Sequence, residues 1–264
     1  MATGNQAEQF DPNRFSGSNW LTFTPPWSEA EVGWWRDHMF KPHGLYPDDL
    51  GELLSASIVG NKLVTLSDLD VRDDSFVIRV TGRANETGEA WWHQRRLDLR
   101  GQIFEAQRMI IPLEDQQKGR GRLLMADLVD TAARLGIRQI TVEAQDVGRY
   151  AWARLGFVPD RGSWNFQIRI EARRRLLRSR GEIEPSLFSA YLDTLDGEDP
   201  LLIRQVAEWN VPVDSLRDFD ENGNPAKIAI GKALLLETGA QWYGVFDLDD
   251  EETMNIFKRY VARP

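Results

Sequence analysis

The sequence of 264 residues contains no cysteine and only three histidines. The first absence excludes disulfide bridges, a thiolate nucleophile, and cysteine-ligated zinc or iron–sulfur sites. The spacing of His38, His43 and His93 does not match a histidine metal motif, so we expect no metal ion. No segment approaches the roughly 20 consecutive apolar residues that a membrane helix needs. Residues 1–10 lack the basic start and apolar run of a secretory signal, so we expect a cytoplasmic protein.

The net charge of −9 is concentrated near one end of the sequence. Residues 181–264 carry 17 acidic and 7 basic side chains, whereas residues 1–180 carry 24 and 25. An acidic segment repels phosphate backbones, so nucleic-acid binding is disfavoured and cationic substrates or partners are favoured. The alternative is that this charge serves solubility alone.

Helix signals dominate the first 60 residues after a loop-rich arm over residues 1–17. Ser28 and Glu31 form an S-x-x-E capping box, which predicts a helix over residues 31–40 that stops before Pro42. Asp48 starts a second predicted helix, over residues 48–58. We expect a loop between Leu63 and Ser75.

The middle of the chain changes from strands to alternating strands and helices. Strands are predicted over 75–82, 90–99 and 102–111, joined by hairpin turns at 85–88 and 100–101. Later elements follow from apolar spacing and glycine caps. They are helices over 121–135, 147–155, 187–195, 200–209, 227–236 and 251–261, and strands over 137–143, 164–170 and 241–248.

A basic segment over residues 171–180 is predicted to be a helix or a linker. Its five arginines suggest contact with nucleic acid or with a CoA phosphate, but a solvated helix face is the favoured interpretation. They are Arg173, Arg174, Arg175, Arg178 and Arg180.

The segment Q-Q-K-G-R-G at residues 116–121 lies between a predicted strand and a predicted helix. Its two glycines let the backbone approach a bulky group, and the helix start offers N–H groups to an anion. Lys118, Arg120 and Arg122 add positive charge. The segment is neither the G-x-G-x-x-G dinucleotide fingerprint nor a Walker loop.

A Q-x-x-G-x-G segment that opens a helix after an antiparallel meander resembles the acyl-CoA motif of the GNAT acetyltransferase superfamily. Leu155-Gly156-Phe157, at the end of a helix, is similar to a second motif of that family. The resemblance covers about residues 60–170. It implies a splayed sheet and direct transfer of an acyl group from acetyl-CoA to an amine. The residues that it implies for CoA binding are Ile110, Ile111, Gln116, Gln117, Lys118, Gly119, Arg120, Gly121, Arg122 and Trp152.

Acyl transfer to an amine calls for a general base and a general acid. Glu105 stands eleven residues before Gln116, where several family members place a glutamate base; the alternative is a polar residue of a half-exposed strand. Glu143 and Asp146 are the reserve candidates. The family's usual tyrosine acid is replaced by Trp152, which cannot supply a proton usefully.

Tyr150 is the nearest substitute for the missing acid, but it lies about 200° around the helix from Trp152. Packing is therefore the favoured role of Tyr150, and water or another residue is the alternative source of the proton. A further departure is the missing pair of helices between the first two expected strands. Either the family's first strand lies near residues 20–23, which is the favoured interpretation, or this half of the fold is rearranged.

Two other features are set aside. The segment D-F-D-E-N-G at residues 218–223 copies half of a calcium loop, but its twelfth position is Ala229, so an Asx turn before a helix is expected. The tryptophans near the N-terminus could wall an acceptor pocket, but core packing is favoured.

These patterns predict an α+β or α/β protein with a GNAT-like, mixed, mostly antiparallel splayed sheet flanked by helices. The expected organisation is an arm over 1–17, an acyl-CoA-binding domain over 18–180 and a mostly helical acidic subdomain over 181–264. The expected function is acetyl-CoA-dependent N-acylation of a small-molecule or peptide amine, without metal, nucleic acid or membrane; a homodimer is possible. The alternatives are a non-catalytic CoA-binding or partner-binding module and an enzyme of the same fold with another donor or reaction.

Overall fold

The computed structural model describes residues 9–83, 89–112 and 118–262. The chain forms two compact units, residues 1–140 and residues 141–264. The predicted boundary near residue 180 concerns domain organisation and stays a prediction.

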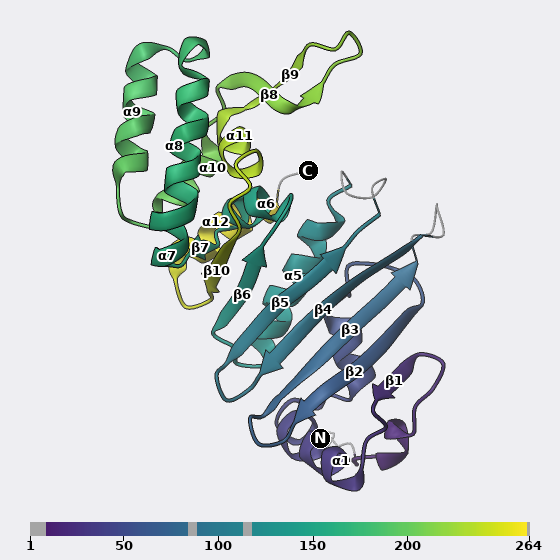
Figure 1. The fold of residues 1–264 in the computed structure, drawn as a ribbon. Helices are drawn as coiled ribbons and strands as arrows, with labels where there is room; N and C mark the ends of the chain where they lie inside the picture. Colours follow the sequence, from purple (N-terminus) through teal and green to yellow (C-terminus); the bar gives the residue numbers. More distant parts are fainter. Residues whose placement is uncertain (1–8, 84–88, 113–117, 263–264) are drawn as a thin grey trace, which may run out of the picture. The chain divides into compact units, whose positions relative to one another are not determined.

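A five-stranded sheet forms the first unit, in the order β1-β2-β3-β4-β5 (Figure 1). β1 pairs in parallel with β2, and the other neighbours are antiparallel. The strands are β1 (Leu21–Thr24), β2 (Lys62–Asp70), β3 (Ser75–Arg83), β4 (Ala90–Asp98) and β5 (Ile103–Ile110).

Helices cover one face of this sheet and leave the other face open (Figure 1). The core between them contains Trp35, Phe76, Phe104 and Leu128, all fully buried. The helical elements of this unit are η1 (Pro12–Phe15), α1 (Glu29–Trp35), η2 (Arg36–Phe40), α2 (Lys41–His43), α3 (Pro47–Leu53) and α5 (Arg120–Arg134).

The predicted capping box at the start of α1 is confirmed. The Ser28 backbone N–H donates to Glu31 Oε2 at 2.6 Å, and the Ser28 side chain accepts in return. The predicted stop before Pro42 is wrong, because a π-helical turn leads into α2 and places Pro42 in its first turn. The helix ends instead at Gly44, whose φ of 67° is left-handed.

The N-terminal half of the sheet contains two strands, β1 and β2, that bear on the sequence predictions. A strand near residues 20–23 was expected and is present as β1. The expected loop between Leu63 and Ser75 is wrong, because Lys62–Asp70 forms β2 and pairs with both neighbours. Lys62 is the first residue on the buried face of β2, and its Nζ lies 2.7 Å from Glu52 Oε2. A lysine on the buried face hides the alternation of apolar and polar residues that predicts a strand.

The second unit contains a small sheet and most of the later helices. β6, β10 and β7 are neighbours in that order, and β10 pairs with β7 antiparallel. β8 and β9 form a separate two-stranded hairpin. The strands are β6 (Gln139–Ala144), β7 (Val158–Pro159), β8 (Pro212–Phe219), β9 (Pro225–Ala229) and β10 (Trp242–Asp247). The helices are α6 (Gly148–Leu155), α7 (Arg161–Ser163), η3 (Trp164–Ile168), α8 (Arg169–Arg178), η4 (Arg180–Glu182), α9 (Pro185–Asp196), α10 (Leu202–Glu208), α11 (Ile230–Leu236) and α12 (Glu251–Val261).

In the second unit, the strand predicted over residues 164–170 and the helix predicted directly after the Asx turn are both wrong. Residues 164–170 alternate in sequence but form η3 and the start of α8, because Trp164 and Ile168, four apart, are the buried pair. The predicted Asx turn is confirmed, since Asp220 Oδ1 accepts from the N–H groups of Asn222 and Asn224. It joins two strands, however, rather than leading directly into a helix.

The fold class expected from the sequence is confirmed at the level of architecture: mixed, mostly antiparallel strands are flanked by helices. The C-terminal part carries more strand than expected, because β8, β9 and β10 all lie beyond residue 181. Within the described ranges, the helices are all too short or too polar to cross a bilayer.

Candidate functional site

The junction between β5 and α5 contains the Q-Q-K-G-R-G segment. Gln116 and Gln117 lie outside the described residues, and Lys118, the first described residue of the segment, is exposed. Gly119 caps α5 in the left-handed region, with φ of 74°. That conformation favours glycine, and the first N–H groups of α5 have no partner within the helix.

Both glycines of this junction are in tight surroundings. A Cβ on Gly119 would lie 2.9 Å from Arg122 Nη2. A Cβ on Gly121 would lie 3.3 Å from Ile111 Cδ1 and 3.5 Å from Met109 Cε. The start of α5 therefore packs at Gly121 against side chains from the end of β5. The structure thus brings Ile111 together with the glycine turn.

Glu105 lies on β5, half-buried, on the open face of the sheet. Gln107 Nε2 donates to Glu105 Oε2 at 3.4 Å, and Gln94 Nε2 donates to Gln107 Oε1 at 2.9 Å. The pairing of β4 with β5 shifts between Gln94 and Arg96, which marks a β-bulge beside Glu105. A bulge leaves one residue out of the ladder and can redirect the neighbouring side chains.

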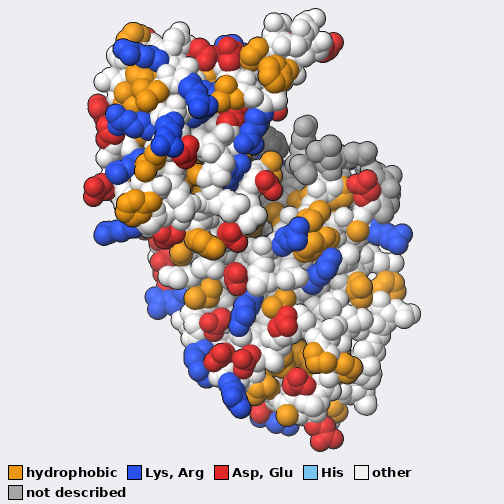
Figure 2. Space-filling view, in the orientation of Figure 1, with side chains coloured by type: hydrophobic (Ala, Val, Ile, Leu, Met, Phe, Trp, Pro, Cys, Tyr) orange, Lys and Arg blue, Asp and Glu red, His pale blue; other side chains and the backbone are white. Residues whose placement is uncertain are grey.

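A basic and aromatic group lies on the same open face, over β3, β4 and β5. The Arg79 guanidinium carbon lies 4.0 Å from the centre of the Trp92 ring, and that of Arg108 lies 5.5 Å from it. Figure 2 shows basic and apolar side chains together over these strands. Ile110 is part of this face, because it pairs with Trp92 and is 39% exposed.

No sequence pattern singled out Arg79, Gln94 or Arg108. On β4, Leu97 is fully buried and Trp92 is half-exposed, so the two lie on opposite faces of the strand. Strict alternation along β4, with Trp91 buried, was the signal that could have separated them.

The covered face behind the bulge carries two buried basic side chains. Arg95 is fully buried, and its Nη1 donates to the carbonyl oxygens of Gln94 and Arg108 at 3.1 and 3.2 Å. Burial lowers its pKa to about 10. Burial and the positive charges of Arg95 and Lys62 hold the pKa of His93 well below its ordinary value. Arg95 therefore ties β4 to β5 at the irregular register.

The second unit holds the two aromatic residues considered for proton transfer. Trp152 on α6 is 9% exposed and packs against Phe157, with ring centres 5.2 Å apart. Gly148 makes room for it, since a Cβ there would lie 2.7 Å from Trp152 Nε1. Tyr150 is half-exposed on another side of the helix. α6 ends at Gly156, with φ of 102°, as the sequence predicted.

The reserve candidates have surroundings typical of a loop. Glu143 is exposed on β6, and Asp146 is exposed with φ of 46°. Arg149 Nε donates to the backbone oxygen of Asp146 at 3.1 Å, and Arg149 Nη2 donates to that of Leu236 at 2.8 Å. Asp146 therefore helps to shape the start of α6 through its backbone.

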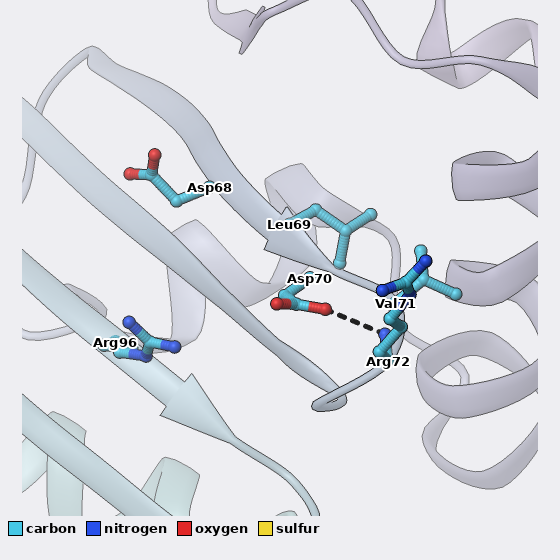
Figure 3. Close-up of a pocket in the computed structure, with 6 residues that line it drawn as sticks. All are labelled: Asp68, Leu69, Asp70, Val71, Arg72 and Arg96. Atoms are coloured by element: carbon cyan, nitrogen blue, oxygen red, sulfur yellow. Dashed lines mark hydrogen bonds between the residues drawn. The ribbon is translucent and has the colours of Figure 1, made fainter.

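A shallow hollow lies at the β2–β3 turn of the first unit, lined by residues 68–72 and Arg96 (Figure 3). Asp70 Oδ1 accepts from the N–H groups of Arg72 and Asp73, and these hydrogen bonds lower its pKa. Arg96 donates to Ser75 Oγ at 2.9 Å. The polar groups of the hollow therefore maintain the turn, and we assign no chemistry to it.

No family model and no curated protein matches this chain. Among solved structures, nourseothricin acetyltransferase is similar to part of it, at 19% sequence identity and a TM-score of 0.28. The match covers 34% of this chain and 53% of that acetyltransferase, so it spans about half of the relative's length. A likeness this weak carries no functional argument.

Proposed function

We propose that this protein is an acetyl-CoA-dependent N-acyltransferase of GNAT type that acts on the amine of a small molecule or peptide. The observation that carries the proposal is the glycine turn at the start of α5. Gly119 is left-handed, and Gly121 lies against the end of β5. The turn offers backbone N–H groups to a pyrophosphate at the positive end of a 15-residue helix.

The cradle has the chemistry that an acyl-CoA needs. Lys118, Arg120 and Arg122 add positive charge around the turn. Ile110 and Ile111 offer an apolar strand end beside it, suited to the pantetheine arm. The resemblance adds Gln116 and Gln117 to this set. No metal is needed for direct transfer to an amine.

Glu105 is proposed as the base that removes a proton from the acceptor ammonium, through water. Its half-buried place on the open face leaves it within reach of solvent and of an acceptor. The hydrogen bond from Gln107 limits its rotation. Catalysis then consists mainly of holding the free amine against the thioester carbonyl. Backbone N–H groups at the β5 bulge are suited to polarising that carbonyl.

The proton for the departing CoA thiolate is assigned to water or to Tyr150. Trp152 cannot supply it, because an indole N–H is not an acid at neutral pH. Its burial against Phe157 gives it a packing role within the second unit.

Calorimetric titration with acetyl-CoA tests the cradle. We expect micromolar binding by the wild type and loss of binding in Gly119→Glu, which adds bulk and negative charge. Gly136→Glu is the matched control: Gly136 follows the other end of α5, its φ is also positive at 70°, and nothing lies within 4 Å of its Cβ position. Equal binding by both variants, or none by the wild type, would overturn the proposal.

A second candidate is a module that binds acyl-CoA or a partner without turnover. The tryptophan in place of the usual tyrosine is the observation that favours it. Its signature is acetyl-CoA binding that depends on Gly119, with no thiol released across a panel of amines.

A further inference from the structure

The open face of the first sheet carries a row of three side chains, one from each of three neighbouring strands. Arg79 on β3 pairs with Gln94 on β4, and Gln94 pairs with Arg108 on β5. Paired residues project from the same face of a sheet, with strands about 4.8 Å apart. Both arginines are exposed, and Gln94 between them is half-buried.

Trp92 holds the two guanidinium groups over the sheet. Its ring lies 4.0 Å from the guanidinium carbon of Arg79 and 5.5 Å from that of Arg108. Stacking on an aromatic ring restricts an arginine while leaving its N–H fork available to an anion. In the described part of the chain, neither arginine has a carboxylate at ion-pair distance. Among the described residues, two positive forks are thus presented without an ion-paired carboxylate.

The row is connected to the proposed base. Gln94 Nε2 donates to Gln107 Oε1 at 2.9 Å, and Gln107 Nε2 donates to Glu105 Oε2 at 3.4 Å. Glu105 therefore lies on the same open face as Arg79 and Arg108, while Arg96, its partner in the ladder, donates to Ser75 Oγ. This pattern is complementary to a molecule with an ammonium at one end and an anion at the other.

We propose that this face, defined by Arg79, Trp92, Gln94 and Arg108, binds the anionic group of a zwitterionic acceptor. The inference rests on the proposed function for the role of Glu105. The acceptor's ammonium lies at Glu105, and its carboxylate or phosphate lies on the two arginines. The acceptor is thus a small amine that carries an acidic group a few bonds from its nitrogen. The acidic C-terminal region favoured a cationic acceptor; the open face adds an anionic group to it.

Direct binding tests this site without turnover. The probes are 3-aminopropylphosphonate and 4-aminobutanoate, which separate phosphate-like from carboxylate recognition, with propylamine as the probe without an anion. We expect the wild type to bind at least one anionic probe, and propylamine at least 10-fold more weakly. Arg79→Gln/Arg108→Gln is expected to lose at least 10-fold in affinity for that anionic probe. Arg79→Lys/Arg108→Lys, which keeps the charge, is expected to lose less.

Two control variants fix the location of the bound probe. Arg36→Gln removes the same charge from an exposed position on η2 and is expected to bind the probe as the wild type does. Gly119→Glu is expected to keep probe binding, because Gly119 lies at the start of α5 and not among the four residues that define the open face. Loss of probe binding in Gly119→Glu would place the probe in the cradle and overturn the inference.

Failure of this inference is distinguishable from failure of the proposed function. Wild-type protein that binds neither anionic probe, or a glutamine double variant that binds equally well, overturns the inference whatever acetyl-CoA does. A double variant that loses acetyl-CoA affinity but keeps probe affinity assigns the arginines to CoA and also overturns it. Probe binding that follows the arginines, without acetyl-CoA binding, supports this anion site and rejects the acyltransferase.

Discussion

Arg175 Nε lies 2.7 Å from Glu237 Oε2, and the two side chains are 4% and 2% exposed. The rest of the pair is also satisfied: Arg175 Nη2 donates to the Asp214 carbonyl at 2.6 Å, and Ser215 Oγ donates to Glu237 Oε1 at 2.6 Å. This buried ion pair joins α8 to the residue after α11 within the second unit. A solvated helix face was expected for this arginine, and that interpretation is wrong for it.

Removal of one partner from this pair leaves a buried charge without compensation. We expect Arg175→Met to lower the free energy of unfolding by about 3–5 kcal/mol. Arg173→Met is the control, because Arg173 pairs with Asp196 where both side chains are about half exposed, and about 1 kcal/mol or less is expected there. Urea denaturation measures the free energy of unfolding of both variants. Equal losses of stability in the two would contradict the structural role given to Arg175.

His93 makes stability depend on pH. Its pKa is held well below the ordinary value in the folded protein, by burial first and by Arg95 and Lys62 next. The unfolded chain therefore binds a proton as pH falls through about 6.5, while the folded chain does not. Stability contributed by neutral His93 is complete above that pH and is lost below it.

Thermal unfolding between pH 7.5 and pH 5 measures this dependence. His93→Gln is expected to flatten the curve, whereas His38→Gln, at a side chain 41% exposed, is expected to leave it in place. A wild-type melting temperature that stays constant over that interval would be inconsistent with a buried neutral histidine.

Glu105→Gln tests the proposed base. The change removes the proton acceptor but keeps the shape, so we expect kcat to fall by about 10²- to 10⁴-fold with acetyl-CoA binding unchanged. Glu143→Gln, at the exposed reserve candidate, is expected to keep near-normal kcat. The opposite result in the two variants would transfer the role to Glu143.

Substitution by alanine is expected to have opposite effects on stability at two helical glycines, Gly231 and Gly33. In α11, a Cβ on Gly231 would lie 2.1 Å from the backbone oxygen of Val206, so Gly231→Ala forces backbone to move. We expect a loss of about 1–3 kcal/mol. In α1, nothing lies within 4 Å of the Cβ position of Gly33, so Gly33→Ala is expected to stabilise by about 0.4–1 kcal/mol. Denaturant midpoints report both changes, and a stable Gly231→Ala protein would contradict the close packing of α11.

Much of the local structure follows from the sequence alone. The Ser28–Glu31 capping box and the glycines that end α5 and α6 were predictable, because each depends on neighbours within a few residues. The three strands of the meander and the apolar face of α5 were predictable for the same reason. The glycine turn at Gly119 and the position of Glu105 on a strand belong to this class.

The tertiary structure decided what depends on distant partners. β2 exists because β1 and β3 pair with it, and residues 164–170 are helical because burial selects Trp164 and Ile168 against their period-two pattern. The β5 bulge and the burial of Arg175 likewise require partners from other elements. The row of Arg79, Gln94 and Arg108 is invisible in the sequence, because only strand register places residues from three strands side by side. The sequence by itself therefore determined the elements and the chemistry of the glycine turn, whereas pairing and packing determined which side chains share a face.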